Sequence, residues 1–296
     1  MKILNCVISY NRSHYLKNMI DSIKEFFPYG KTIIVDDQSN NIHTQNYLND
    51  LKIREYVVLN TKIDKTNNLF KGGLYHAMDI GMQYAMDHNY DYINYLQDDM
   101  QCMWYDKDFE NTVEKIFRSS ENVLSICSEF YKKITSYRQR NQISIFQDIG
   151  AYDRKPLAAP AVSIISIERF KKLKFKFGDY DSEFSYNTPL SNLGYYCLTP
   201  KAPHFAWIPW PKTTTFGVTK GVEKPPVKKY YFKPIVGKKL DKFLNRDLIK
   251  IPYIEDYCQT WGYLSLKPYW FTQFSLQYFK MIKRNFYSKI FLFPHF

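Results

Sequence analysis

The sequence lacks several features that would assign it at once to a common class. None of its apolar runs approaches the ~18–20 residues of a membrane span, and its first residues lack the apolar stretch and small-residue cleavage site of a signal peptide. Its five cysteines are scattered without a CxxC pair, which argues against a disulfide framework and a zinc ribbon. These absences predict a protein of the reducing cytoplasm.

Two common nucleotide-binding fingerprints are also missing. There is no GxGxxG and no GxxxxGK[ST], so neither a dinucleotide motif nor a P-loop is present. The 296 residues do contain ordinary shares of hydrophobic (45%) and charged (24%) residues, and many aromatics (18%). This composition predicts a globular protein of one large or two modest domains, with aromatic-lined clefts or an aromatic surface.

Short β-branched runs alternate with helical patterns through the first hundred residues. Strands are expected at 2–9, 32–35, 56–59 and 92–96, and helices at about 13–27, 42–53 and 72–87. The alternation predicts an α/β fold with a Rossmann-like, mostly parallel sheet flanked by helices. The pattern then weakens, with a helix expected at 108–118 and strands at 123–126 and 161–166.

Polar residues gather where three of these predicted strands end. They are Ser9, Tyr10, Asn11 and Arg12, then Asp36 and Asp37, then Gln97, Asp98 and Asp99. Ligands of open α/β sheets bind beyond the carboxyl ends of the strands, so we expect a binding site here. Adjacent carboxylates suit Mg²⁺ or Mn²⁺. The alternatives are a helix cap for Asp98 and Asp99 and an Asx turn for Asp36 and Asp37.

The order of these motifs resembles that of family 2 glycosyltransferases, which have the GT-A fold and use nucleotide-sugar donors. The matching blocks are VISYNR (7–12), IVDDQS (34–39), the pair Gly72-Gly73 with Ala77 and Gly81, and LQDD (96–99). FGDYDSEF (177–184) and LGY (193–195) are similar to the family's G-G-F-D-E and A-G-Y stretches. The resemblance covers about residues 1–210. It implies a catalytic domain there, followed by a C-terminal extension over 211–296 whose first part, about 211–240, is an irregular linker.

The resemblance also implies a role for each block. The donor would be bound by the residues at 9–12, by Asp36 and Asp37, by Gly72 and Gly73, and by Gln97 and Asp98. The metal, Mn²⁺ or Mg²⁺, would be held by Asp99 with Asp98 and His204, although a packed histidine is the alternative for His204. Glu183, then Asp181, then Asp179 would be the base that takes the proton of the acceptor hydroxyl, and a solvated acidic loop is the alternative for all three. Two positions depart from the family pattern, with Gln97 at the first position of DxD and Met78 in place of the usual arginine.

The activity that the resemblance implies is a metal-dependent, inverting sugar transfer. The donor would be a nucleoside-diphosphate sugar, UDP-linked in the first instance, and the acceptor a saccharide or lipid-linked saccharide in polysaccharide or glycoconjugate synthesis. A sugar nucleotidyltransferase is one alternative, but it would need a glycine-rich loop after the first strand. A non-catalytic binding or scaffold protein is the other, and Gln97 and Met78 favour it.

The net charge of +12 is concentrated near the C-terminus. Residues 1–211 hold 25 Lys+Arg and 24 Asp+Glu, a net of +1, whereas residues 212–296 hold 16 and 5, a net of +11. Residues 265–296 carry eleven aromatics, five Lys or Arg and no acid, which is typical of a helix lying on an anionic membrane surface. The alternative is a helix packed on the catalytic domain. Nucleic-acid binding ranks last, because no such module is recognisable. If the tail binds lipid, the protein would be peripheral on the inner face of a membrane.

Overall fold

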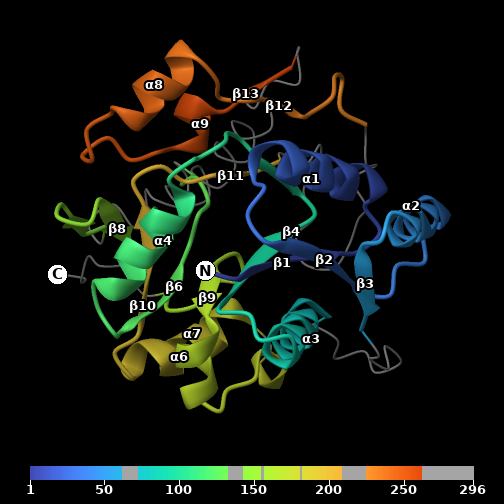
Figure 1. Ribbon diagram of the computed structural model, residues 1–296, viewed down its shortest axis with the longest axis horizontal. Coiled ribbons are helices and arrows are strands. Elements are labelled where there is room, and N and C mark those ends of the chain that lie inside the picture. The colour runs from blue at the N-terminus through green and yellow to red at the C-terminus, as the bar shows by residue number, and fades with distance from the viewer. Residues whose placement is uncertain (62–72, 133–142, 155–156, 181, 209–224, 262–296) are drawn as a thin grey trace, which may run out of the picture.

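A computed structural model describes residues 1–61, 73–132, 143–154, 157–180, 182–208 and 225–261 (Figure 1). The first elements are β1 (Ile3–Ser9), α1 (Ser13–Phe26), β2 (Lys31–Asp36), α2 (Ile42–Ile53), β3 (Val57–Asn60), α3 (Gly73–Asp87) and β4 (Tyr92–Gln97). The alternation of strands and helices predicted for this part of the chain is confirmed.

The second half contains shorter elements. They are β5 (Met100–Cys102), α4 (Phe109–Arg118), β6 (Val123–Ile126), β7 (Ile145–Phe146), β8 (Ala151–Asp153), β9 (Ile164–Ser166), α6 (Ile167–Lys172), the 3₁₀-helix η2 (Phe177–Asp179), α7 (Glu183–Asn192), β10 (Tyr196–Pro200), β11 (Phe205–Trp207), β12 (Phe232–Lys233), α8 (Lys238–Leu244), α9 (Ile254–Tyr257) and β13 (Gln259–Thr260). The strands predicted at 123–126 and 161–166 and the helix at 108–118 correspond to β6, β9 and α4.

The central sheet has the order β3-β2-β1-β4-β9-β6-β10-β8-β7. β1 is parallel to both β2 and β4, with Ser9 opposite Asp36 and Ile8 opposite Gln97. The carboxyl ends of these three strands therefore lie at one edge. β9 is antiparallel to β4 and to β6, which makes the sheet mixed. The α/β class predicted from the sequence is confirmed.

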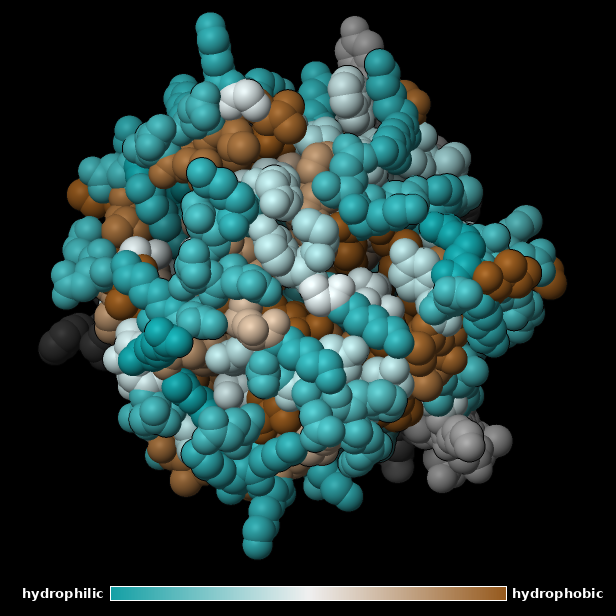
Figure 2. Space-filling model, viewed as in Figure 1, coloured by the Kyte–Doolittle hydropathy of each residue, from teal (hydrophilic) through white to brown (hydrophobic). Residues whose placement is uncertain are grey.

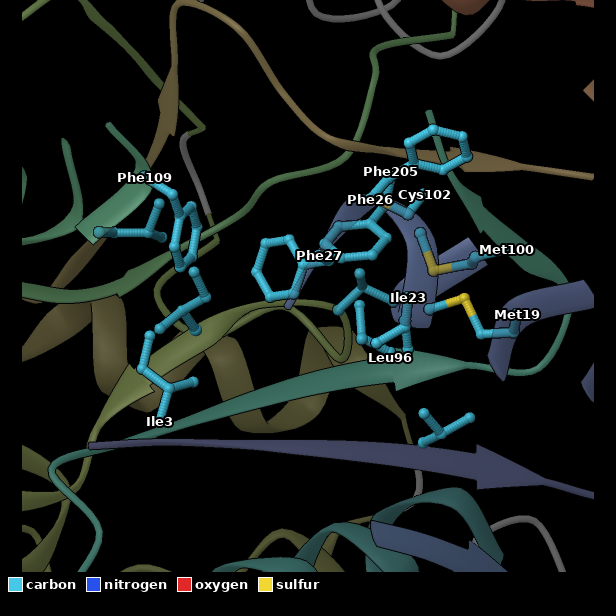
Figure 3. Packing of buried hydrophobic residues seen from close by; sticks show 14 of the residues in the cluster. Ile3, Met19, Ile23, Phe26, Phe27, Leu96, Met100, Cys102, Phe109 and Phe205 are labelled. Atoms are coloured by element: carbon cyan, nitrogen blue, oxygen red, sulfur yellow. The ribbon is translucent and has the colours of Figure 1, made fainter. Parts of the chain in front are cut away.

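Helices cover both faces of this sheet (Figure 1). One apolar cluster packs α1, α2 and α4 against one face, through side chains that include Leu16, Leu48, Val113, Val7 and Leu96. Figure 3 shows Met19 and Ile23 of this cluster close to Leu96, and Phe27 facing Phe109. A second cluster packs α3, α6 and α7 against the other face. Both faces of the strands are thus buried, which suits their continuous apolar runs.

Residues 225–261 pack on the N-terminal part of the chain and contribute to a third apolar cluster. The Phe232 backbone N–H donates to Gln101 Oε1 at 2.9 Å, and Gln101 Nε2 donates to the Phe232 carbonyl at 3.0 Å. The Tyr231 N–H donates to Asn18 Oδ1 in α1 at 3.3 Å. The described part of the predicted extension therefore shares a core with the part of the chain that precedes it. The predicted membrane segment at 265–296 lies outside the described residues.

Two further observations concern the outside of the molecule. Among the described residues, none of the helices has the length and apolarity to cross a bilayer. Figure 2 shows that the face seen in Figure 1 is covered mostly by hydrophilic side chains, with apolar groups set between them.

Candidate functional site

Asp98 connects the ends of β1 and β4. It follows β4 directly and is buried. Its Oδ2 accepts hydrogen bonds from Ser9 Oγ at 3.0 Å and from the Tyr10 backbone N–H at 3.1 Å, and its Oδ1 accepts one from Arg12 Nη1 at 2.9 Å. Residues predicted from two separate sequence blocks therefore meet in one site.

Arg12 joins Asp98 to Asp99. Its Nη1 atom also lies 3.3 Å from Asp99 Oδ2, so one guanidinium nitrogen bridges two adjacent carboxylates. Burial raises the pKa of Asp98; Arg12 opposes this rise, and the neighbouring Asp99 adds to it. Buried carboxylates are unfavourable unless cations compensate them. Arg12 supplies part of this compensation.

Asp36 takes a structural role in the turn that follows β2. Its Oδ2 accepts from the Ser39 N–H at 2.8 Å and its Oδ1 from Ser39 Oγ at 2.5 Å. Ser39 Oγ also accepts from the Asn11 N–H at 2.8 Å, and Asn11 has a positive φ of 55°. These bonds close a turn after β2, and Ser39 ties this turn to the segment after β1.

Asp37 lies beside the start of α3. Its Oδ1 accepts from Thr61 Oγ1 at 2.8 Å, and its backbone N–H donates to the Ser9 carbonyl at 2.8 Å. A Cβ atom on Gly73 would lie 2.0 Å from Asp37 Oδ2. Residue 73 therefore has to be glycine for Asp37 to keep this position. The other glycine of the pair, Gly72, lies outside the described residues.

The donor atoms at the sheet edge fit a hard divalent cation that is held by few protein ligands. Mg²⁺ and Mn²⁺ can bind one or two carboxylates and complete their shells with water and phosphate oxygens. Asp99, with Asp98 beside it, could hold such an ion, whereas Gln97 adds no charge. In the part of the chain that the structure describes, no group of three or more His, Cys, Asp or Glu side chains is placed to hold a metal. An ion at Asp99 would therefore depend on water and substrate for most of its ligands.

The acidic residues at 179–183 lie in different environments. Glu183 is the first residue of α7, and its Oε1 accepts from the Ala161 N–H at 2.8 Å. Burial raises the pKa of Glu183, and Glu129 adds to this effect. Asp179 is exposed and lines a hollow of about 690 Å³ on the outer side of α3. Asp181 lies outside the described residues. Among the candidate bases, Glu183 therefore has an environment that favours its protonated form.

The structure places His204 differently from the predicted metal ligand. Its Nδ1 lies 2.7 Å from Ser128 Oγ, its Nε2 lies 3.2 Å from Asp106 Oδ2, and its ring stacks on Trp104. Its backbone carbonyl accepts from the Met103 N–H, four residues beyond Asp99. Both ring nitrogens are therefore engaged in the core. This corrects the metal assignment in favour of the packed histidine.

Sequence reasoning missed a second group of charged residues beside the site. Glu129 accepts hydrogen bonds from Arg154 and from the Trp207 indole. Lys132 Nζ lies 4.6 Å from the centre of the Trp207 ring. Burial lowers the pKa of Lys132, whereas Glu129 and Asp99 oppose this. Lys132 and Arg154 belong to a polar, basic stretch at 131–158, and no spacing in the sequence assigned them, Glu129 or Trp207 to the site.

Comparison with known proteins gives a family match and several remote likenesses of fold. The profile of the family described as Glycosyl transferase family 2 matches residues 6–177. No curated protein matches the chain. The structure of TarS from S. aureus is similar with 12% identity and a TM-score of 0.49, covering 71% of this chain and 37% of that chain. The mannosyltransferase PcManGT from Pyrobaculum calidifontis, in complex with GDP-Man and Mn²⁺, is similar with 15% identity and a TM-score of 0.48, covering 67% and 54%. The matched region spans less than two thirds of each of these proteins.

The family match covers more than half of the chain and includes the residues that form the sheet edge. The chain therefore belongs to glycosyl transferase family 2. The predicted family and its GT-A fold are confirmed.

Proposed function

We propose that the chain transfers a sugar from a nucleoside-diphosphate sugar to an acceptor hydroxyl, with inversion at the anomeric carbon and with Mn²⁺ or Mg²⁺ as cofactor. The observation that carries this proposal is the convergence of Asp36, Asp37, Asp98 and Asp99 at one edge of the sheet. The site would bind the donor with its nucleoside near β2 and its diphosphate near the end of β4.

Asp37 is the residue we assign to the nucleoside. Its carboxylate is oriented by Thr61 and lies against Gly73, where α3 begins. Asp36 supports this position indirectly, because its bonds to Ser39 shape the turn. Ionised carboxylates accept hydrogen bonds from base N–H groups and ribose hydroxyls.

Asp99 is the residue we assign to the metal. A divalent cation there supplies charge neutralisation for the departing diphosphate when it is bound. Arg12 neutralises part of the charge of Asp98 and Asp99, since it bridges them. Ser9 and the Tyr10 N–H keep Asp98 oriented, so the chain presents Asp99 from a fixed backbone position.

Glu183 is the residue we assign to the base. An acceptor hydroxyl has a high pKa, and a carboxylate in hydrogen-bond reach can take its proton as the anomeric carbon is attacked. Burial raises the pKa of Glu183, which makes its carboxylate a better proton acceptor than an exposed one. A direct attack of this kind inverts the anomeric carbon.

The proposal also names the donor nucleotide and the class of acceptor. We propose a UDP-linked donor and a saccharide or lipid-linked saccharide acceptor, in the synthesis of a polysaccharide or glycoconjugate. The basic, aromatic residues 265–296 would bring the enzyme to a cytoplasmic membrane surface that carries such an acceptor.

The proposal is tested by a transfer assay with a panel of UDP-, GDP- and dTDP-sugars and mixed saccharide acceptors, with Mn²⁺ or with EDTA. We expect one donor to release its nucleoside diphosphate, and proton NMR to show an inverted anomeric configuration. A retained configuration would contradict the single displacement. Release of pyrophosphate from a sugar phosphate and a nucleoside triphosphate would instead identify a nucleotidyltransferase.

A further inference from the structure

We propose that the hollow on the outer side of α3 binds the acceptor, and that this acceptor is a saccharide carrying negatively charged groups, phosphate or carboxylate. The inference rests on the proposed function and names the chemical class of its acceptor. The hollow lies between α3 and the segment from α6 to η2, and is called the α3 hollow below.

The α3 hollow is elongated. Its wall on α3 contains His76, Asp79, Gln83 and Met86. These residues are three or four apart, so they lie on one face of the helix. Ten residues of α-helix span about 15 Å. The volume of about 690 Å³ lies in the range of sites that bind small molecules. The hollow can therefore hold more than one sugar unit.

One end of the α3 hollow lies toward the candidate site. His76 is in the first turn of α3, three residues after Gly73, which lies against the Asp37 side chain. η2 packs on the same turn, since a Cβ atom on Gly178 would lie 2.4 Å from His76 Nδ1. Asp179 lines the hollow at this end. The segment 179–183, which carries the candidate bases, therefore begins where the hollow comes closest to the site.

The wall opposite α3 carries three lysines. The Ile167 N–H, at the start of α6, donates at 3.1 Å to the carbonyl of Asp91, which precedes β4. α6 thus begins at the sheet edge opposite the candidate site, and the chain from α6 to η2 runs along the hollow. The lysines that this segment contributes to the lining are Lys171, Lys174 and Lys176.

These three lysines give the α3 hollow unpaired positive charge. All three are exposed, and the described part of the chain gives none of them an ion pair, whereas the neighbouring Lys172 donates to Glu168 at 2.8 Å. Two carboxylates also line the hollow. Asp79 is engaged, because it accepts from the Phe177 and Gly178 N–H groups at 2.8 Å each, and Asp179 lies at the end near the site. The rest of the wall favours an anionic ligand.

The lining between the two walls is apolar, and this favours a saccharide. Ile80, Met82, Phe170 and Phe175 contribute to it. Sugar rings present C–H faces that can pack on such side chains, while phosphate or carboxylate groups along a saccharide accept charge-assisted hydrogen bonds from ammonium groups. A saccharide held in the hollow would extend toward the segment 179–183. Binding its remote units would help to position the reacting hydroxyl.

The test measures saccharide binding by calorimetry with matched charged and neutral probes. The probes are oligogalacturonate and its methyl ester, and maltooligosaccharides with and without phosphate. The wild type is compared with a triple variant of the hollow and with a control that removes the same charge from exposed lysines outside it. The substitutions are Lys171→Gln, Lys174→Gln and Lys176→Gln in the former, and Lys24→Gln, Lys31→Gln and Lys52→Gln in the latter.

We expect at least one anionic saccharide to bind the wild type at least about tenfold more tightly than its neutral counterpart. The triple variant of the hollow should lose this preference, and the control should keep it. Binding should also weaken with salt, because exposed charges are screened over ~10 Å at 0.1 M. If the triple variant melts below the wild type, the three single substitutions give the same comparison.

Three results would overturn the inference. One is equal binding of charged and neutral saccharides, or of the triple variant and the wild type. Another is tighter binding of polyglutamate or of phosphatidylglycerol vesicles through the same lysines, which would assign the hollow to an acidic protein or a membrane. The third is a wild type that binds a nucleoside diphosphate with Mn²⁺ but none of the anionic saccharides. If it bound no nucleoside diphosphate, the proposed function itself would fail, so the two failures are distinguishable.

Discussion

Gly73→Ala is a small change with a defined consequence at the proposed nucleoside site. The new Cβ atom would lie 2.0 Å from Asp37 Oδ2 and 2.5 Å from its Cγ. Asp37 has to retreat by about 1 Å before the first contact reaches 3.0 Å. Its hydrogen bond from Thr61 Oγ1, now 2.8 Å long, is then lost or distorted.

The expected change in the free energy of unfolding follows from this one hydrogen bond. A hydrogen bond to a charged group contributes about 1.5–3 kcal/mol, and alanine in a helix is better than glycine by up to about 1 kcal/mol. We therefore expect Gly73→Ala to lower the free energy of unfolding by about 0.5–2 kcal/mol. If the displaced Asp37 also loses its bond to the nucleoside, the Kd of the nucleotide should rise roughly 10- to 100-fold.

Gly81→Ala is the matched control in the same helix. Its Cβ would meet Cys6 Sγ at 2.6 Å in the core, away from the site. Overpacking of this kind costs about 1–3 kcal/mol, so both variants should be destabilised in urea unfolding. Only Gly73→Ala should lose nucleotide affinity in calorimetry. A folded Gly73→Ala variant that binds nucleotide as tightly as the wild type would refute the assignment of Asp37.

Four further predictions concern charged residues. Glu183→Gln should lower kcat by about 10²–10⁴-fold with unchanged donor affinity, and unchanged turnover would move the base to Asp181 or Asp179. The base must be ionised, and burial raises the pKa of Glu183. A profile of kcat/KM against pH should therefore show activity falling at a pH higher than that at which an ordinary glutamate titrates. Because the raised pKa favours the protonated folded form, the wild type should lose stability relative to Glu183→Gln as pH rises through that pKa, which thermal melts can measure. Arg154→Met should cost about 1–3 kcal/mol in urea unfolding, since it leaves the half-buried Glu129 carboxylate without this cation, and adding Glu129→Gln should recover part of the loss.

The first half of the fold could be predicted because its signals are local. Each strand is a short β-branched run, and each helix carries its own periodic apolar stripe. The antiparallel β9 and the pairing of β11 with β5 depend on contacts between distant segments, which no local pattern marks. The helix α7 was missed because it contains Pro189 in its interior. The capping box of Ser182 and Ser185 was the available signal for its start.

The site residues that follow strands could be predicted, because ligands of open α/β sheets bind beyond the carboxyl ends of the strands. Asp98 and Asp99 meet the segment after β1 because parallel strands place their carboxyl ends together. Arg154, Glu129 and Lys132 come from a part of the chain with no clear periodicity. Their position depends on long-range pairing, because Glu129 pairs with Phe205 of β11 and Arg154 follows β8. His204 was misassigned because sequence order could not show that Ser128 and Asp106 engage its ring.

The measurement that tests the account most directly is a calorimetric titration of UDP, GDP and dTDP, with Mn²⁺ and with EDTA. The wild type is compared with Asp99→Ala and with Asp87→Ala, an exposed carboxylate at the end of α3. The account predicts that one diphosphate binds with Mn²⁺, that EDTA and Asp99→Ala each weaken binding by about tenfold or more, and that Asp87→Ala changes nothing. Binding of no diphosphate, or binding unaffected by both EDTA and Asp99→Ala, would contradict it.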